Sequence, residues 1–185
     1  MTYLRWLFLT LLDWLLLLTV PFVAPIVAAF YREQPYGRRP YTWGWLYGTW
    51  DNPPQGDQGF VRQRALFLGV TTGFKGYLNR VMWMLRNPLY GFAKLSSTPY
   101  DPEHKLTYVG NPDVSDKYKN AGFYFAKLHD NKKLIAFEFY CVYPWAFGRC
   151  LRVRIGWKLM TDKFQRYGFA QLVNTCNPFS SFGDN

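Results

Sequence analysis

The sequence predicts an α+β protein: an N-terminal transmembrane helix, an amphipathic helix, and then a small antiparallel meander of about four β-strands. Three observations predict this fold. Residues 6–30 are almost entirely apolar, residues 76–86 repeat apolar side chains at helical spacing, and the last third alternates apolar and polar side chains between turns. The chain accordingly divides into an anchor (1–31), a connector (32–64), an amphipathic helical region (65–95) and an antiparallel β domain (96–185).

The N-terminal segment is long enough to cross a bilayer. Residues 6–30 number 25 and include a single charged residue, Asp13. A hydrocarbon core about 30 Å thick needs roughly 20 apolar residues in a helix. Aromatic side chains near both ends of the segment are expected at the two membrane interfaces. The residues assigned to the anchor are Trp6, Asp13, Trp14, Pro21, Pro25, Phe30 and Tyr31.

Three other interpretations of this segment remain open. Val27 and Ala29 occupy small-residue positions of a signal-peptide cleavage site, although the apolar region is about twice the usual length and Asp13 interrupts it. A buried core helix is the second alternative. The third is a monotopic hairpin that turns back at Pro21 and Pro25, because proline removes helical donors.

Asp13 is the one residue of the anchor with distinctive chemistry. A carboxylate at mid-bilayer costs about 2.5 to 3.5 kcal/mol on insertion scales, so it usually faces a partner or water. With Thr10 one turn away on the same face, self-association through the helix is one expectation. Protonation of Asp13, or contact with a water defect, is an equal alternative.

The charge distribution predicts which side of the membrane the body occupies. The net charge is +10, and residues 32–100 carry nine Lys and Arg against three acids. Arg32, Arg38 and Arg39 follow the apolar segment, whereas only Arg5 and the amino terminus precede it, so the positive-inside rule places the C-terminal body in the cytoplasm. Such a basic body attracts anionic lipid, and nucleic acid by the same charge.

Two patterns characterise the middle of the chain. The connector is rich in Pro, Gly and aromatic residues, and its WDNPPQGDQGF turn does not match the spacing of a calcium loop. The helix over residues 76–86 ends at Asn87-Pro88 and either lies on the membrane or covers the sheet. One of its faces carries Tyr77, Leu78, Val81, Met82 and Leu85, and the other carries Arg80, Trp83 and Arg86.

Strands are predicted over residues 122–128, 133–143, 149–159 and 168–176, with a short one at 106–109. In the third of these, apolar side chains alternate with Arg152, Arg154 and Lys158, which indicates one apolar face and one basic face. By the same alternation Cys141 and Cys150 fall on opposite sides, so we expect no disulfide between them. The predicted basic binding residues are Arg32, Arg38, Arg39, Arg152, Arg154 and Lys158.

Several strings of the sequence carry a resemblance. LYGTWDNPPQGDQGF, RNPLYGF, YVGNPDVSDK, RCLRVRIGWKL and AQLVNTCNPF occur in this order. Over residues 46–179 the chain resembles a family of small, uncharacterised, basic membrane-associated proteins encoded by tailed bacteriophages. The resemblance implies a phage product that acts in or on a bacterial host or is carried in the virion, and it supplies no activity or site.

No catalytic, metal-binding or cofactor-binding motif is found in the sequence, so no catalytic residue, metal or cofactor is predicted. We expect a membrane-anchored, non-enzymatic accessory protein of a phage, whose basic cytoplasmic body binds a protein partner or anionic lipid headgroups. The alternative is a nucleic-acid-contacting virion or DNA-delivery component. The expected location is the inner membrane of the bacterial host, or alternatively the virion. A membrane-lesion role through Asp13-mediated oligomers ranks third.

Overall fold

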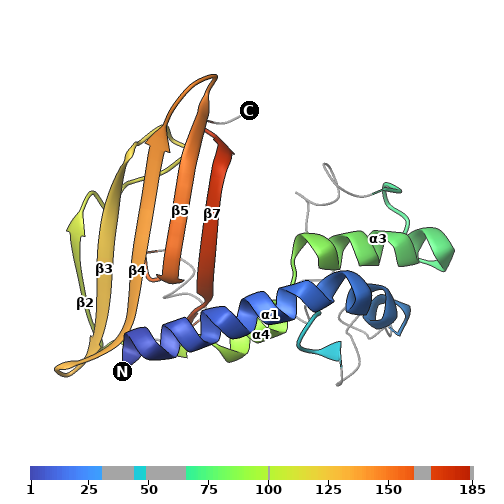
Figure 1. The fold of residues 1–185 in the computed structure, drawn as a ribbon, viewed down its shortest axis with the longest axis horizontal. Helices are drawn as coiled ribbons and strands as arrows, with labels where there is room; N and C mark the ends of the chain where they lie inside the picture. Colours follow the sequence, from blue (N-terminus) through green and yellow to red (C-terminus); the bar gives the residue numbers. More distant parts are fainter. Residues whose placement is uncertain (31–43, 49–65, 100, 161–167, 184–185) are drawn as a thin grey trace. The chain divides into compact units, whose positions relative to one another are not determined.

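The computed structural model describes residues 1–30, 44–48, 66–99, 101–160 and 168–183 (Figure 1). The chain forms two compact units. The first, which we call the β unit, joins Met1–Phe8 to Ser96–Asn185, and the second, the helical unit, comprises Leu9–Leu95. An apolar N-terminal helix, short helices and antiparallel sheets make the fold α+β, which confirms the predicted fold class.

Helix α1 covers Thr2–Ala29, 28 residues, and is therefore about 42 Å long. Its Leu-rich sequence favours a helix because unbranched side chains lose little rotamer freedom there. Pro21 and Pro25 lie inside the helix, and the chain does not turn back at either of them. The alternative of a hairpin that turns at these prolines is therefore wrong.

The helical unit continues with α3 (Gly73–Arg86) and α4 (Tyr90–Leu95). As predicted, α3 stops before Asn87-Pro88: Asn87 leaves the helical conformation, and its N–H donates to the Trp83 carbonyl. Helix α4 approaches the segment 44–48 closely, because Phe92 N–H donates to the Leu46 carbonyl over 3.2 Å. A Cβ atom on Gly91 would lie 1.9 Å from the Trp45 carbonyl oxygen, so only glycine fits there.

The β unit contains a five-stranded antiparallel meander, in the order β2-β3-β4-β5-β7. These strands are β2 (Lys105–Gly110), β3 (Gly122–Asp130), β4 (Lys133–Pro144), β5 (Arg149–Trp157) and β7 (Leu172–Ser181). A separate pair joins β1 (Thr98–Pro99) to β6 (Phe169–Ala170). The count of about four strands was approximate, and the short strand predicted at 106–109 is the outer strand β2.

The register sorts the side chains of the meander onto two faces. Alternate residues of β5 point to opposite sides, and each stays in line with its cross-strand partners on β4 and β7. One side, the aromatic face, carries Val109, Phe123, Phe125, Phe137, Phe139, Cys141, Tyr143, Leu151, Val153, Ile155, Trp157 and Cys176. The other side, the ionic face, carries Tyr124, Ala126, Leu128, Ala136, Glu138, Tyr140, Val142, Cys150, Arg152 and Arg154.

Candidate membrane and binding surfaces

Helix α1 exposes a continuous apolar stripe. The stripe, which we call the α1 stripe, follows three- and four-residue spacing, so its members share one side of the helix. Leu18 is 72 % exposed and Phe22 is 77 % exposed. The opposite side contains the buried residues Thr10, Val20, Ala24, Val27 and Ala28. The α1 stripe consists of Leu4, Phe8, Leu11, Leu15, Leu18, Phe22 and Ile26.

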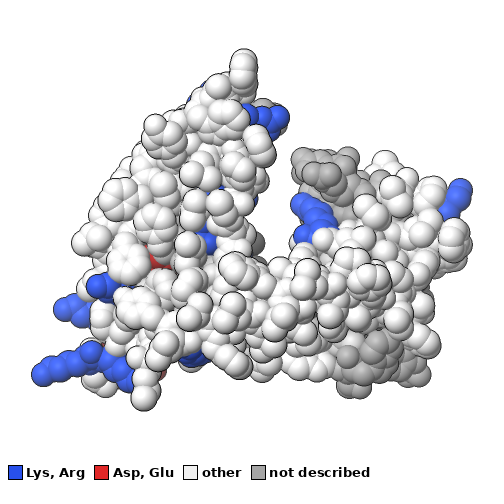
Figure 2. All heavy atoms as spheres, in the orientation of Figure 1, with Lys and Arg blue, Asp and Glu red and all other residues white. Residues whose placement is uncertain are grey.

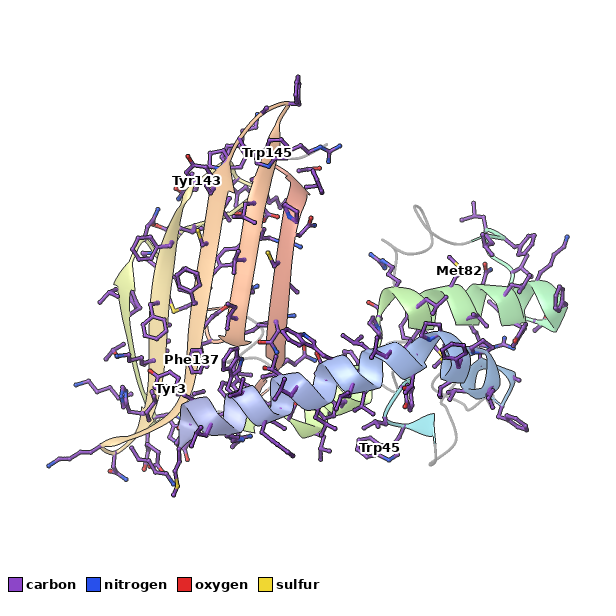
Figure 3. The ribbon with its side chains drawn as sticks, viewed as in Figure 1. Tyr3, Trp45, Met82, Phe137, Tyr143 and Trp145 are labelled. Atoms are coloured by element: carbon purple, nitrogen blue, oxygen red, sulfur yellow. The ribbon has the colours of Figure 1, made fainter. Side chains whose placement is uncertain are left out.

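Helix α3 buries part of the side that lies opposite its predicted apolar face. Trp83 is 1 % exposed, and Asn79 on the same side is also buried. The apolar side of the helix is half-buried or exposed, with Phe74 and Leu85 among the exposed residues, and Met82 points away from α1 in Figure 3. Helix α3 belongs to the helical unit, and both alternatives, that it covers the sheet or that it lies on a membrane, stay predictions.

Polar groups occupy the interior of the helical unit. The Asn79 side chain accepts from Phe67 N–H over 3.0 Å and donates to the carbonyls of Phe67 and Val70 over 2.6 and 3.0 Å. Arg80 donates from Nε to the Ala28 carbonyl over 3.1 Å and from Nη1 to the Thr71 carbonyl over 3.0 Å. A guanidinium at the last turn of α1 satisfies a carbonyl that the helix leaves unpaired and complements the helix dipole.

The residues assigned to the anchor do not share one environment. Trp6 is half-buried in the β unit, where its Nε1–H donates to Asn174 Oδ1 over 2.8 Å and its ring packs edge-on against Phe137. Asp13 is half-buried, three residues from the buried Thr10. Trp14, Pro21 and Phe30 are exposed and Pro25 is half-buried. Tyr31, Arg32, Arg38, Arg39 and most of the connector (32–64) lie outside the described residues.

The prediction of a basic face on the sheet is wrong, because the arginines of that face form ion pairs. Arg154 donates from Nε to Glu138 Oε1 over 2.6 Å, and the Glu138 side chain is 0 % exposed. The second carboxylate oxygen, Oε2, accepts from the backbone N–H groups of Leu159 and Met160 over 2.7 and 2.9 Å. Burial, and then the nearby charge of Glu138, raise the pKa of Tyr124, which also accepts a hydrogen bond from Arg154.

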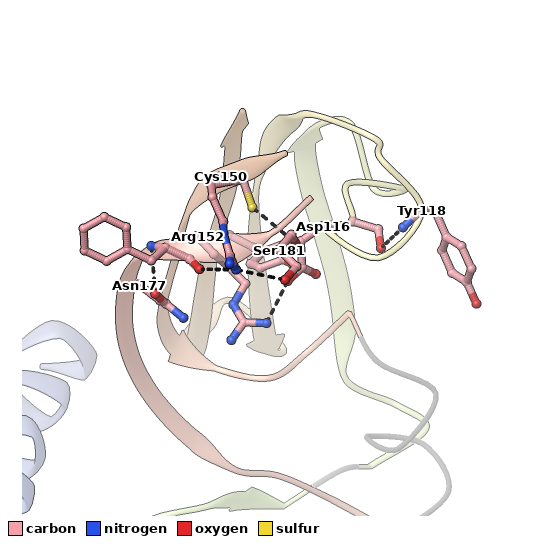
Figure 4. A network of polar contacts seen from close by, with 10 residues as sticks. Asp116, Tyr118, Cys150, Arg152, Asn177 and Ser181 are labelled. Atoms are coloured by element: carbon pink, nitrogen blue, oxygen red, sulfur yellow. Dashed lines mark hydrogen bonds and ion pairs between the residues drawn. The ribbon is translucent and has the colours of Figure 1, made fainter. Parts of the chain in front are cut away.

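A second ion pair neutralises the next arginine along β5. Arg152 donates to Asp116 Oδ2 over 2.8 Å, as the network in Figure 4 shows. The other oxygen, Oδ1, accepts from the Tyr140 hydroxyl over 3.3 Å. Lys158 is half-buried at the end of the strand. Arg152 and Arg154 are therefore not a row of free cations, because carboxylates distant in sequence reach them.

The aromatic face is the more open apolar surface of the sheet. Phe123 and Tyr143 on this face are exposed, and Figure 2 shows few charged residues over the middle of the sheet on its viewed side. Beyond the strands, the β4–β5 turn carries Trp145 and Phe147, the latter 95 % exposed. The alternation of side chains along the strands predicted which residues share each face, but it did not predict which face is covered.

The described residues contain no group of three or more His, Cys, Asp or Glu side chains that could hold a metal ion. The turn at residues 51–57 lies outside this description. Cys141 pairs in register with Val153 and Cys150 with Pro144, on opposite faces, as the alternation predicted. Burial raises the pKa of both thiols, which disfavours the reactive thiolate.

These features define a class: an α+β protein in which one described helix is long and apolar enough to cross a membrane. The chain belongs to the Family of unknown function (DUF7338), whose model matches residues 1–183. The match includes α1, both units and nearly the whole chain. No curated protein and no solved structure is significantly similar to it.

Proposed function

We propose that the protein is a membrane-anchored, non-enzymatic accessory protein whose β unit binds a partner or anionic lipid headgroups at the membrane surface. One observation carries the proposal: in the helical unit, large apolar side chains are exposed, while the buried Asn79 and the half-buried Arg80 hydrogen-bond to backbone groups. This distribution suits a lipid solvent, in which polar groups face the interior and small residues allow close helix packing.

The energetic argument rests on the α1 stripe. Burying one Leu or Phe side chain is worth about 1.5 to 3 kcal/mol, so the seven members of the stripe represent on the order of 10 kcal/mol. Left in water, a contiguous apolar surface of this kind promotes aggregation. Insertion among acyl chains removes that cost without requiring a polar face on α1, because the rest of the helical unit covers the other side.

The contacts of the first turns favour a retained helix that enters the membrane from the cytoplasmic side without crossing it. Met1–Phe8 and Ser96–Asn185 form one unit, so both ends of the chain belong on the same side of a membrane. Arg32, Arg38 and Arg39 follow α1, and positive charge is retained on the cytoplasmic side. A signal-peptide interpretation is disfavoured because cleavage near Ala29 would remove Trp6 from its contacts with the sheet.

The resemblance to phage proteins supports a setting in the inner membrane of a bacterial host, with the virion as the alternative. The nucleic-acid alternative loses support, because Arg152 and Arg154 are already paired with Asp116 and Glu138. Binding of duplex DNA that weakens steeply with salt would restore that alternative.

Carbonate extraction of membranes from expressing cells tests the anchor. We expect the wild-type protein to stay in the pellet. Leu18→Arg places a charge on the α1 stripe and removes apolar area from it, so this variant is expected to move a large fraction into the supernatant. Tyr118→Arg is the matched control, because this exposed residue belongs to the β unit. Complete release of the wild-type protein by carbonate would refute the proposal.

A further inference from the structure

We propose that the aromatic face of the sheet and the β4–β5 turn rest on the surface of an anionic bilayer. This inference deepens the proposed function and rests on it, because the anchor brings the β unit to the membrane. It names the surface of the β unit that faces the lipid, together with the headgroup chemistry that this surface suits.

The charges of the aromatic face favour an anionic partner. In register with its apolar residues, the face carries Lys105 on β2 and Lys127 on β3. The paired positions of this face in β2, β3, β4, β5 and β7 include no Asp or Glu. A second copy of the sheet would therefore offer these lysines no carboxylate, whereas lipid phosphates provide negative charge along the whole surface.

The first turns of α1 lie on this same face of the sheet. The rings of Tyr3 and Trp6 pack against Phe137 with centroids 4.8 and 5.6 Å apart, and the Arg5 guanidinium lies 5.3 Å from the centroid of the Trp157 ring. Figure 3 shows Tyr3 beside Phe137 at one end of the sheet. Leu4 and Phe8, the two members of the α1 stripe that belong to the β unit, are both exposed.

The β4–β5 turn presents aromatic side chains at the opposite end of that face. Trp145 donates from Nε1 to the Pro178 carbonyl over 2.8 Å, and its ring packs edge-on against Phe179 with centroids 5.8 Å apart. Trp145 N–H also donates to the Arg149 carbonyl over 2.9 Å, which closes the turn. Tyr and Trp are enriched where headgroups meet acyl chains. These contacts hold the rings in place, so little conformational freedom is lost when they meet the bilayer.

Two neighbouring residues of β7 provide a matched test. Cys176 is exposed on the aromatic face, in register with Val153, and Thr175 is exposed on the ionic face, in register with Arg154. An environment-sensitive fluorophore is attached to Cys176, or to Thr175→Cys combined with Cys176→Ser. Both proteins also carry Cys141→Ala and Cys150→Ala. The full chain is reconstituted in vesicles of phosphatidylethanolamine and phosphatidylglycerol that contain brominated lipid.

We expect brominated lipid to quench the label at Cys176 at least threefold more than the label at Thr175→Cys. A third label, at Leu18→Cys on the α1 stripe, reports separately on the proposed anchor. Quenching at Leu18→Cys without quenching at Cys176 overturns the present inference and leaves the anchor intact. No quenching at Leu18→Cys contradicts the anchor itself, and equal quenching at the two β7 positions also overturns the assignment of the face.

A second variant separates lipid contact from self-association. Phe147→Glu, at the β4–β5 turn, is expected to reduce quenching at Cys176 by at least half, whereas Tyr118→Glu, an exposed aromatic residue outside the aromatic face, leaves it unchanged. Circular dichroism verifies that both variants fold. Excimer emission from pyrene at Cys176, without quenching by lipid, assigns the face to a second copy of the chain and overturns the inference.

Discussion

Both units of the molecule bury polar groups, but the units differ in where their large apolar side chains lie. In the β unit, Glu138 and Arg154 form an ion pair on a face that also buries Tyr124, Leu128 and Val142. In the helical unit, Asn79 and Arg80 bind backbone carbonyls, while the leucines and phenylalanines of α1 remain exposed. The β unit has one open apolar face, whereas the helical unit buries Trp83 and Phe92 but exposes a row of large apolar side chains along α1.

The difference teaches that the position of the large apolar side chains, rather than the presence of buried polar groups, distinguishes the environments of the two units. Glu138 in the β unit and Asn79 in the helical unit are both hydrogen-bonded, because an unpaired buried polar group costs about 1–3 kcal/mol. Water drives Leu and Phe inward, and lipid does not. The comparison therefore yields tests in which similar substitutions have different effects in the two units.

The largest expected effect is all-or-none and concerns the side of the membrane on which the two tagged segments lie. Epitope tags at Met1 and at Asn185 are expected to be protected from protease in spheroplasts and digested together in inverted inner-membrane vesicles. The reason is that both tagged segments belong to the β unit. Immunoblotting measures each tag, and a periplasmic protein provides the control for intact spheroplasts. Digestion of one tag without the other would contradict a common cytoplasmic side.

The next effect is on the stability of the β unit. Glu138→Gln leaves the Arg154 guanidinium without its anionic partner, and breaking a buried ion pair costs about 3 to 5 kcal/mol. Urea unfolding in detergent micelles, followed by near-ultraviolet circular dichroism, measures the free energy of unfolding. Glu103→Gln, in an exposed loop, is the matched control and should change it by less than about 0.5 kcal/mol. Equal effects of the two substitutions would rule out the structural role of Glu138.

The smallest effect sharpens the comparison within α3. Asn79→Leu places a more apolar residue in the interior, yet it is expected to destabilise the helical unit by about 1–3 kcal/mol, because backbone groups of Phe67 and Val70 lose their partners. Leu78→Asn, on the adjoining half-buried side, should leave unfolding almost unchanged but weaken retention in carbonate-washed membranes. Thermal unfolding and extraction measure the two effects. Stabilisation by Asn79→Leu would show that the interior is not organised by this amide.

Much of the fold could be predicted from local patterns. The long apolar segment identified α1, the Asn87-Pro88 pair identified the end of α3, and alternation in β5 identified which residues share a face. These predictions succeed because helix and strand periodicities follow from backbone geometry alone. The start of α3 and the bounds of β7 were less accurate, because the ends of elements depend on contacts with the rest of the chain.

The candidate surfaces could be predicted less well. The prediction of a basic face was wrong because each arginine pairs with a carboxylate distant in sequence. Arg152 binds Asp116, 36 residues away, and Arg154 binds Glu138, 16 residues away. Trp6 was predicted at a membrane interface, yet it binds Asn174, which is 168 residues away in sequence. These partners lie far along the chain from the residues that they contact, so the spacing of residues in the sequence could not reveal the pairs.

By itself, the sequence determined where the chain is helical, where it is extended and which side chains share a face, because these properties depend on neighbours in the chain. Only the tertiary structure decided which of those faces is covered: Trp83 is buried and Leu85 exposed on α3, and Glu138 is covered while Phe123 remains open on the sheet. The physical reason is that burial depends on segments that folding brings together from distant positions, and periodicity contains no record of them.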